Sequence, residues 1–236
     1  MRLLVSVVDA REARTALAGG ADIVDVKNPS EGSLGAPVPR TIADVRAAVP
    51  AAIPVSVALG DMPSLPGTAA LAALGAATSG ATYVKVGLWG TSTEDAAIAL
   101  LRATREALTG ASAVSVIAAG YADAERLPGR PLAPHRLPHV ARAAGVAGCL
   151  LDTGIKDGRG LFDWLSPPTV LALVDEAHDA GLEVALAGAL SDRDLPTVLA
   201  TGADIAGVRS AACRDGVRTA PLDRERIRRL RSTCLV

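Results

Sequence analysis

Eight short runs rich in Val, Ile and Leu alternate with eight helical, mostly Ala-rich stretches along the chain. Strands that are each followed by a helix pair in parallel, so this alternation predicts a parallel sheet covered by helices. The predicted strands are 3–8, 22–27, 53–59, 82–88, 113–120, 148–153, 183–188 and 204–209. The predicted helices are 10–20, 41–49, 65–79, 91–108, 135–145, 166–181, 191–202 and 223–232.

Two layouts compete for such a chain, a closed eight-fold barrel and an open doubly wound sheet. Eight units in 236 residues match the usual barrel size of about 250 residues. The first strand-to-helix turn, VVDARE, lacks the GxGxxG pattern of dinucleotide-binding open sheets. No linker or change of composition divides the chain. We therefore predict an α/β fold, a single-domain TIM (β/α)8 barrel that spans residues 1–236.

The composition narrows the class of function. A net charge of −1 and five aromatic residues argue against a nucleic-acid partner. No apolar run reaches the roughly 18 residues of a membrane span, and the first apolar run is better explained as a core strand than as a signal peptide. The three cysteines have no CxxC spacing, which fits a reducing compartment. We expect a cytoplasmic protein.

Lysine is rare here, and its positions are informative. Of the 24 basic residues only three are lysines, Lys27, Lys85 and Lys156. Because alternate strand residues point inward, Asp25 and Lys27 should share the inner side of the second strand, and Lys85 should face inward from the fourth. Asp152 ends the sixth strand, just before Lys156. All three lysines therefore lie at the carboxyl ends of strands or in the loop next to them, where TIM barrels build active sites.

Desolvation can convert lysine into a neutral amine, whereas arginine keeps its proton in a protein. Free lysine is neutral in about one molecule in 2,000 at pH 7, but burial and neighbouring ammonium groups lower its pKa. A neutral amine forms an imine with a carbonyl group. We predict that Lys27 is the nucleophile and Asp25 its proton partner, and the alternative is a structural Asp25–Lys27 ion pair.

The carboxyl ends of the seventh and eighth strands offer a phosphate site. Loops at these two positions commonly hold phosphate on backbone N–H groups. The predicted ligands are Gly188, Ala189, Arg209 and Ser210, with Arg209 binding through its two-pronged guanidinium. The alternative for Gly188 is that it only permits tight packing.

Other segments of the sequence give weaker evidence about the site. The Gly- and Pro-rich loops 27–37, 60–68 and 118–134 should shape the same pocket, and Tyr121 and Asp123 could reach it. His135 and His139 are spaced like a zinc pair, but the HExxH glutamate is missing and Pro138 intervenes. We predict no metal site.

Seven segments resemble the (5-formylfuran-3-yl)methyl phosphate synthase family, and they run from the first strand to just past Cys213. DVKNPSEGSLGA and LDTGIKDG are the longest and most specific. The seven segments are LLVSVVDAREA, GGADIVDVKNPSEGSLGAP, YVKVGLWG, AAGYADAER, LLDTGIKDGRGLFDW, DEAHDAGLEVALAGAL and ADIAGVRSAACRDG.

The resemblance implies a carbon–oxygen lyase that joins two glyceraldehyde 3-phosphate molecules with loss of one phosphate and two waters. The product is the furan precursor of methanofuran, and no metal or organic cofactor is implied. Lys27 corresponds to the Schiff-base lysine of the family and Lys85 to its proton-transfer lysine. Asp25, Asp152 and Lys156 match further site positions. From these we expect Asp152 to steer protons and Lys156 to stabilise negative charge or a departing phosphate.

Small residues at Gly154, Ala189 and Ser210 depart from the family pattern, and Ala189 lacks a hydroxyl group that could hold phosphate. Two other functions stay open. One is a class I aldolase acting on another triose or pentose phosphate, and the other is a non-catalytic barrel that binds a phosphorylated metabolite. The expected partner is a small phosphorylated triose. Enzymes of this size often form homo-oligomers, and the sequence leaves the oligomeric state open.

Overall fold

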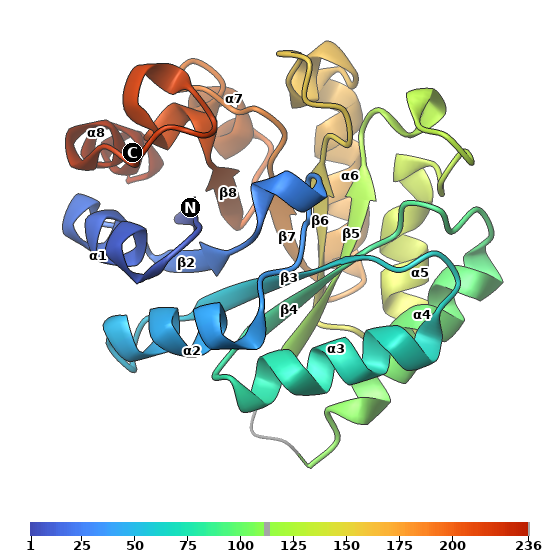
Figure 1. Ribbon diagram of the computed structural model, residues 1–236. Helices are drawn as coiled ribbons and strands as arrows, with labels where there is room; N and C mark the ends of the chain where they lie inside the picture. The colour runs from blue at the N-terminus through green and yellow to red at the C-terminus, as the bar shows by residue number, and fades with distance from the viewer. Residues whose placement is uncertain (111–113, 236) are drawn as a thin grey trace.

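The computed structural model describes residues 1–110 and 114–235 as a closed barrel of eight parallel strands, paired in chain order (Figure 1). The predicted TIM barrel is confirmed. The strands are β1 (Arg2–Val7), β2 (Ile23–Val26), β3 (Val55–Asp61), β4 (Tyr83–Gly87), β5 (Ser115–Tyr121), β6 (Gly148–Asp152), β7 (Glu183–Leu186) and β8 (Ile205–Val208). The fifth strand was predicted to start at residue 113, which lies outside the described residues.

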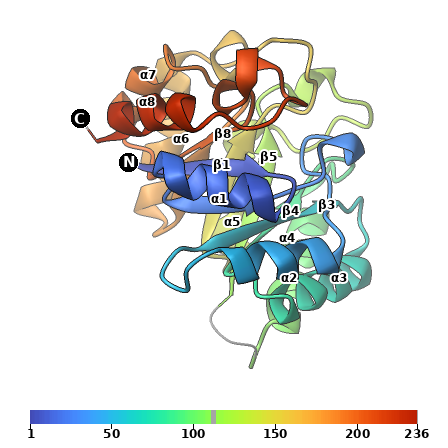
Figure 2. The same ribbon diagram turned by 60° about the vertical axis from the view of Figure 1, so that its left-hand side comes forward.

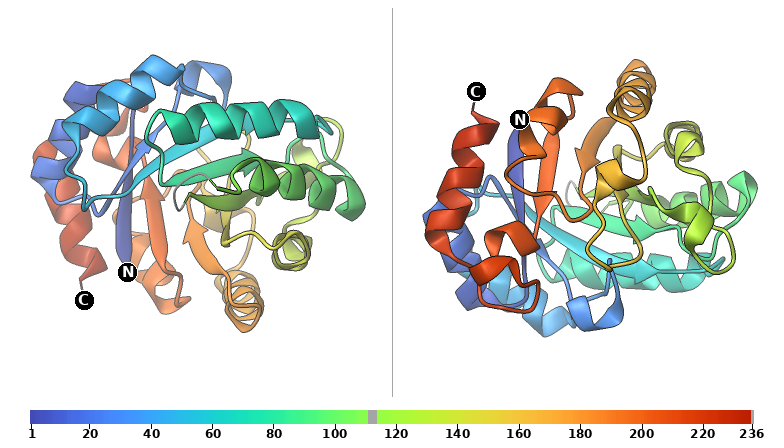
Figure 3. Two further views of the ribbon diagram at one scale, coloured as in Figure 1. Left: turned by 90° about the horizontal axis from the view of Figure 1, so that it is seen from below. Right: turned by 90° about the horizontal axis from the view of Figure 1, so that it is seen from above.

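Each strand is followed by a helix, and these helices surround the barrel (Figure 3). They are α1 (Ala10–Gly19), α2 (Pro39–Ala48), α3 (Pro66–Thr78), α4 (Glu94–Ala107), α5 (Leu137–Ala144), α6 (Pro167–Asp179), α7 (Leu195–Ala200) and α8 (Arg224–Cys234).

Local chemistry sets the helix ends. The Asp9 carboxylate accepts the N–H of Glu12 (2.8 Å) at the start of α1, and Gly20, with a left-handed φ of 93°, ends that helix. The helix α7 starts four residues later than predicted. Asp194 there accepts both the N–H and the hydroxyl of Ser191, which holds residues 191–194 as a turn.

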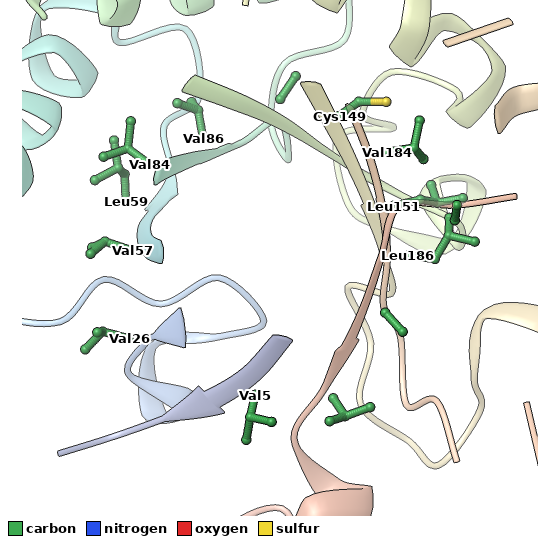
Figure 4. Packing of buried hydrophobic residues seen from close by; sticks show 14 of the residues in the cluster. Val5, Val26, Val57, Leu59, Val84, Val86, Cys149, Leu151, Val184 and Leu186 are labelled. Carbon is green, nitrogen blue, oxygen red and sulfur yellow. The ribbon is translucent and has the colours of Figure 1, made fainter. Parts of the chain in front are cut away.

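Strand residues alternate between two apolar clusters. Val24, Val26 and Val84 belong to the larger cluster, between the strands and the helices. Figure 4 shows Val26 and Val84 with other members of this cluster. Ile23 and Ile117 belong to the smaller inner cluster. Both clusters consist mainly of aliphatic side chains, as the 2% aromatic content requires. This alternation sends the polar residues of the same strands toward the barrel axis.

The two ends of the chain meet beside the first strand. The amino group of Met1 donates to the carbonyl oxygen of Cys234 (3.4 Å), and α1 lies between α8 and α2 (Figure 2). This contact closes the ring of helices. Among the described residues, none of the helices has the length and apolarity that a bilayer crossing requires.

Candidate active site

A cavity of about 230 Å³ opens at the carboxyl ends of the strands. All nine residues that the sequence marked as a candidate site line this one cavity. They are Asp25, Lys27, Lys85, Asp152, Lys156, Gly188, Ala189, Arg209 and Ser210. The fold therefore brings together side chains that are up to 185 positions apart in the sequence.

The stagger of the barrel sorts the inner residues into layers. Asp25 of β2 pairs in register with Ser56, whereas Lys85 of β4 pairs with Ala58, two residues further along β3. Alternate strands contribute to the same layer of a TIM barrel, so Asp25 and Lys85 lie at one level. Lys27, two residues after Asp25, lies one layer nearer the mouth.

Asp25 and Lys85 form a buried ion pair at the lower level. Lys85 Nζ lies 2.5 Å from Asp25 Oδ1, and the Ser6 hydroxyl donates to Asp25 Oδ2 (2.9 Å). Burial alone would raise the pKa of Asp25, but the charges of Lys85 and Lys27 and these hydrogen bonds keep it below its usual value. The sequence left a structural Asp25–Lys27 ion pair open as the alternative to proton transfer. That alternative is wrong, because Asp25 pairs with Lys85, whereas the role of Asp25 as proton partner of Lys27 stays a prediction.

Lys27 has a different environment from the other two lysines. Its side chain is buried, with 7% of the residue exposed, yet no carboxylate of the described residues lies within 4 Å of its amine. Burial, helped by the charges of Lys85 and Arg218, lowers the pKa of Lys27 to about 7 against the opposing charges of Asp152 and Asp25. About half of the Lys27 amines are then neutral at pH 7.

Asp152 and Lys156 form a second ion pair beside Lys27. Lys156 Nζ donates to Asp152 Oδ1 (2.8 Å) and to the Thr153 hydroxyl (3.1 Å). Burial opposes ionisation, but the charges of Lys156 and Lys27 hold the pKa of Asp152 well below its usual range. Ser33, in the loop after β2, donates to Asp152 Oδ2 (3.1 Å) and to the Thr153 carbonyl (2.9 Å). This loop therefore reaches across the barrel mouth to β6.

Asp123 holds the turn that carries Lys156. Its two carboxylate oxygens accept the N–H groups of Gly154 (2.7 Å) and Ile155 (2.8 Å). A Cβ atom at Gly154 would meet the Leu127 side chain at 2.7 Å, so the small residue that departs from the family pattern suits its surroundings. Tyr121 turns away from this group and donates its hydroxyl to Asp61 (2.7 Å).

Gly188 and Ala189, in the loop after β7, line the cavity. Gly188 and Ala189 both have left-handed φ angles, 102° and 49°. Their N–H groups donate to no described residue. Consecutive N–H groups in such a turn can form a concave binding site for an anion.

Arg209 is occupied by contacts within the protein. Its Nε donates to the Arg218 carbonyl (3.0 Å), its Nη1 donates to the Ser6 carbonyl (3.0 Å), and both Nη atoms contact the Glu12 carboxylate. Nη2 also reaches the carbonyl oxygen of Ala220 at 3.5 Å. These contacts use all five guanidinium N–H donors.

The sequence did not single out several polar residues of the site, among them Ser6 and Arg218, which line the cavity, and Ser33, which contacts Asp152. The inward position of Ser6 on β1, in register with Asp25, follows from strand alternation and could have been found. Ser33 and Arg218 lie in loops, whose path no sequence period describes. Within residues 1–110 and 114–235, no cluster of three or more His, Cys, Asp or Glu suits a metal ion, and His139 contacts Glu94 (3.4 Å).

Solved structures share this fold at low sequence identity. The 3-hexulose-6-phosphate synthase of Salmonella typhimurium superimposes with a TM-score of 0.68 at 18% identity, covering 100% of this chain and 99% of the other. The orotidine 5'-phosphate decarboxylase of Pyrococcus horikoshii gives 0.64 at 16% identity, covering 99% of both chains. These similarities establish the TIM-barrel fold alone.

Sequence relatives are much closer. A protein of Methanocaldococcus jannaschii named (5-formylfuran-3-yl)methyl phosphate synthase is 47% identical over 236 residues, which cover 99% of this chain and 100% of the relative. A protein of the same name from Methanopyrus kandleri is 50% identical over 218 residues, 92% of this chain and 91% of the relative. The family model described as 4-HFC-P synthase matches residues 3–231. The chain belongs to the 4-HFC-P synthase family.

Proposed function

We propose that this enzyme condenses two molecules of glyceraldehyde 3-phosphate into (5-formylfuran-3-yl)methyl phosphate through a Schiff base on Lys27. The observation that carries the proposal is the contrast between the three lysines of the cavity. Lys85 and Lys156 are each paired with a carboxylate, whereas Lys27 is buried without such a partner and has a pKa of about 7. Lys27 is therefore the amine that is available for attack on a carbonyl group.

The first step uses this neutral amine. Lys27 Nζ adds to the aldehyde carbon of one triose, and loss of the carbonyl oxygen as water leaves an iminium ion. The iminium withdraws electrons, so the neighbouring carbon can lose a proton and become an enamine. The electron pair of the enamine can then expel the phosphate carried by the next carbon. This accounts for the one inorganic phosphate of the overall reaction, whereas the water lost here is taken up again when the imine is hydrolysed.

The buried ion pairs supply the proton transfers. Lys85 lies one layer below Lys27 in an ion pair with Asp25, so the Asp25 carboxylate can accept the proton of the carbon skeleton and the Lys85 ammonium can return one. Asp152 faces the upper layer with Lys156, which can stabilise the departing phosphate or a developing alkoxide. The second triose loses the proton of its central carbon, and this carbon bonds to the terminal carbon that lost phosphate. Ring closure onto the aldehyde of the second triose then releases two waters, and hydrolysis of the imine takes up the water that its formation released.

The names of the relatives support the product. A (5-formylfuran-3-yl)methyl phosphate retains six carbons and one phosphate, which is what remains of two triose phosphates after loss of one phosphate and two waters. The cavity, about 230 Å³ in volume, is small and rich in cationic side chains, as a site for phosphorylated three-carbon substrates should be.

Incubation with glyceraldehyde 3-phosphate as the sole substrate tests the proposal. We expect a furan chromophore and inorganic phosphate to form in a 1:1 ratio. Aldol products without phosphate release would indicate a class I aldolase instead. Tight binding without any turnover would indicate a barrel that only binds the phosphorylated metabolite.

A further inference from the structure

Five cationic side chains of the described residues line the cavity, and one of them has no carboxylate partner among those residues and no role in the proposed reaction. The five are Lys27, Lys85, Lys156, Arg209 and Arg218. Lys85, Lys156 and Arg209 each contact a carboxylate. Lys27 is the proposed nucleophile. Within the described part of the chain, Arg218 contacts no carboxylate within 4 Å.

Arg218 lies in the loop between β8 and α8, and it lines the cavity. It is half-buried, and its Nη2 atom reaches the Gly32 carbonyl oxygen of the loop after β2 at a long 3.5 Å. The charge of Arg218 acts on Lys27, whose pKa it helps to lower, and Asp152 attracts it. The guanidinium therefore sits near the reacting amine with most of its donors free.

The backbone of this loop is held in place by Arg209. Arg209 Nε donates to the Arg218 carbonyl (3.0 Å), and the thiol of Cys213 approaches the same oxygen at 3.7 Å. Arg209 is in turn fixed by the buried Glu12 carboxylate. The position of Arg218 is thus set by the barrel wall, although its side chain is free to bind.

We propose that Arg218 binds a phosphate group of the substrate at the cavity mouth, together with the free N–H groups of Gly188 and Ala189. A guanidinium forms two parallel hydrogen bonds to a phosphate, and a partly buried cation without a carboxylate partner favours an anion. The inference rests on the proposed function only in requiring that the substrate be phosphorylated. It assigns to Arg218 the contact that the sequence had assigned to Arg209.

The test measures the affinity of inorganic phosphate by isothermal titration calorimetry. We expect Arg218→Ala to weaken phosphate binding about 10- to 100-fold, and Arg218→Lys to weaken it less, because lysine keeps the charge but not the paired geometry. Arg214→Ala is the matched control, since Arg214 is an exposed arginine of the same loop. This control removes the same charge and should change the affinity by less than twofold.

Trapping with borohydride and unphosphorylated glyceraldehyde gives the second readout. Arg218→Ala should still form the Lys27 adduct from glyceraldehyde, whereas its KM for glyceraldehyde 3-phosphate should rise in step with the lost phosphate affinity. Phosphate binding in Arg218→Ala equal to wild type would overturn the inference, and if that variant does not fold, wild-type affinity in Arg218→Lys together with Arg218→Gln would do so. Weakened phosphate binding in an enzyme that makes no furan would support Arg218 and refute only the proposed function.

Discussion

The ammonium group of Lys85 lies 2.5 Å from the carboxylate of Asp25, in the layer of the barrel beneath Lys27. This ion pair offsets the Asp25 carboxylate and keeps a positive charge below Lys27. Both effects favour the neutral form of the Lys27 amine. Burial is the largest cause of the lowered Lys27 pKa, and the charge of Lys85, held there by Asp25, adds to it.

The pH dependence of Schiff-base formation follows from the Lys27 pKa of about 7. Only the neutral amine attacks a carbonyl group, so the rate should rise about tenfold between pH 6 and pH 8 and level off above that. Cyanoborohydride trapping with glyceraldehyde measures this rate without a titrating substrate phosphate. A rate that keeps rising to pH 10 would show an ordinary lysine pKa.

Replacement of Asp25 by asparagine should lower kcat and also lower the pKa of Lys27, and the two effects can be measured separately. Loss of the Asp25 charge leaves Lys85 buried without its partner, and we expect kcat to fall at least about 100-fold. The same loss removes an anion that raises the pKa of Lys27, so the trapping profile should shift to lower pH. Ser6→Ala is the control, because it removes only one hydrogen bond to Asp25 and should have a much smaller effect. A shift to higher pH in Asp25→Asn would contradict the account.

Lys27 should cost the protein stability at neutral pH. Its pKa is lower in the folded than in the unfolded chain, so the unfolded chain binds more protons between pH 7 and 10.5, and stability from this group rises with pH across that window. Lys27→Met should raise the free energy of unfolding at pH 7 by about 2–4 kcal/mol, and by less at pH 9.5. Urea denaturation at both pH values measures this.

The matched variant Lys85→Met should act in the opposite direction. It strands the buried Asp25 carboxylate without its ion pair, which typically costs about 3–5 kcal/mol. Equal destabilisation by Lys27→Met and Lys85→Met at pH 7 would contradict the claim that Lys85 is paired with a carboxylate and Lys27 is not.

Asp123 should act as a positioning residue for Lys156. Asp123→Asn keeps one acceptor oxygen but loses one of the two N–H contacts to Gly154 and Ile155. We expect kcat to fall about 10-fold while the KM for glyceraldehyde 3-phosphate changes little, because Lys156 moves relative to Asp152. Asp123→Glu, which keeps both acceptors, should restore part of the loss. Equal losses of kcat in both variants without that rescue would argue for a merely structural carboxylate.

Much of this site can be predicted from the sequence, because inward and outward residues alternate along each strand. The period of two in DIVDVK and TYVKVG turns Asp25, Lys27 and Lys85 inward, and the parallel order brings the strand ends together. The ion-pair assignment could not be predicted in this way. It depends on the two-residue stagger between β2 and β4, which is a property of barrel closure and not of either strand alone.

Loop residues were harder to place for a different reason. Arg209 directly follows β8 and was the natural candidate for a phosphate contact, but its partner Glu12 lies 197 positions away on α1. Arg218 gave no sequence signal, since its approach to the cavity depends on the path of the loop between β8 and α8. The late start of α7 has a similar cause, because the Ser191–Asp194 turn uses side-chain hydrogen bonds that resemble a helix cap.

Borohydride reduction in the presence of glyceraldehyde 3-phosphate, followed by peptide mass spectrometry, tests the central assignment most directly. The account predicts one covalent adduct, on the peptide that contains Lys27, with none on Lys85 or Lys156. An adduct on either of the paired lysines, or an unmodified enzyme that still forms the furan, would contradict it.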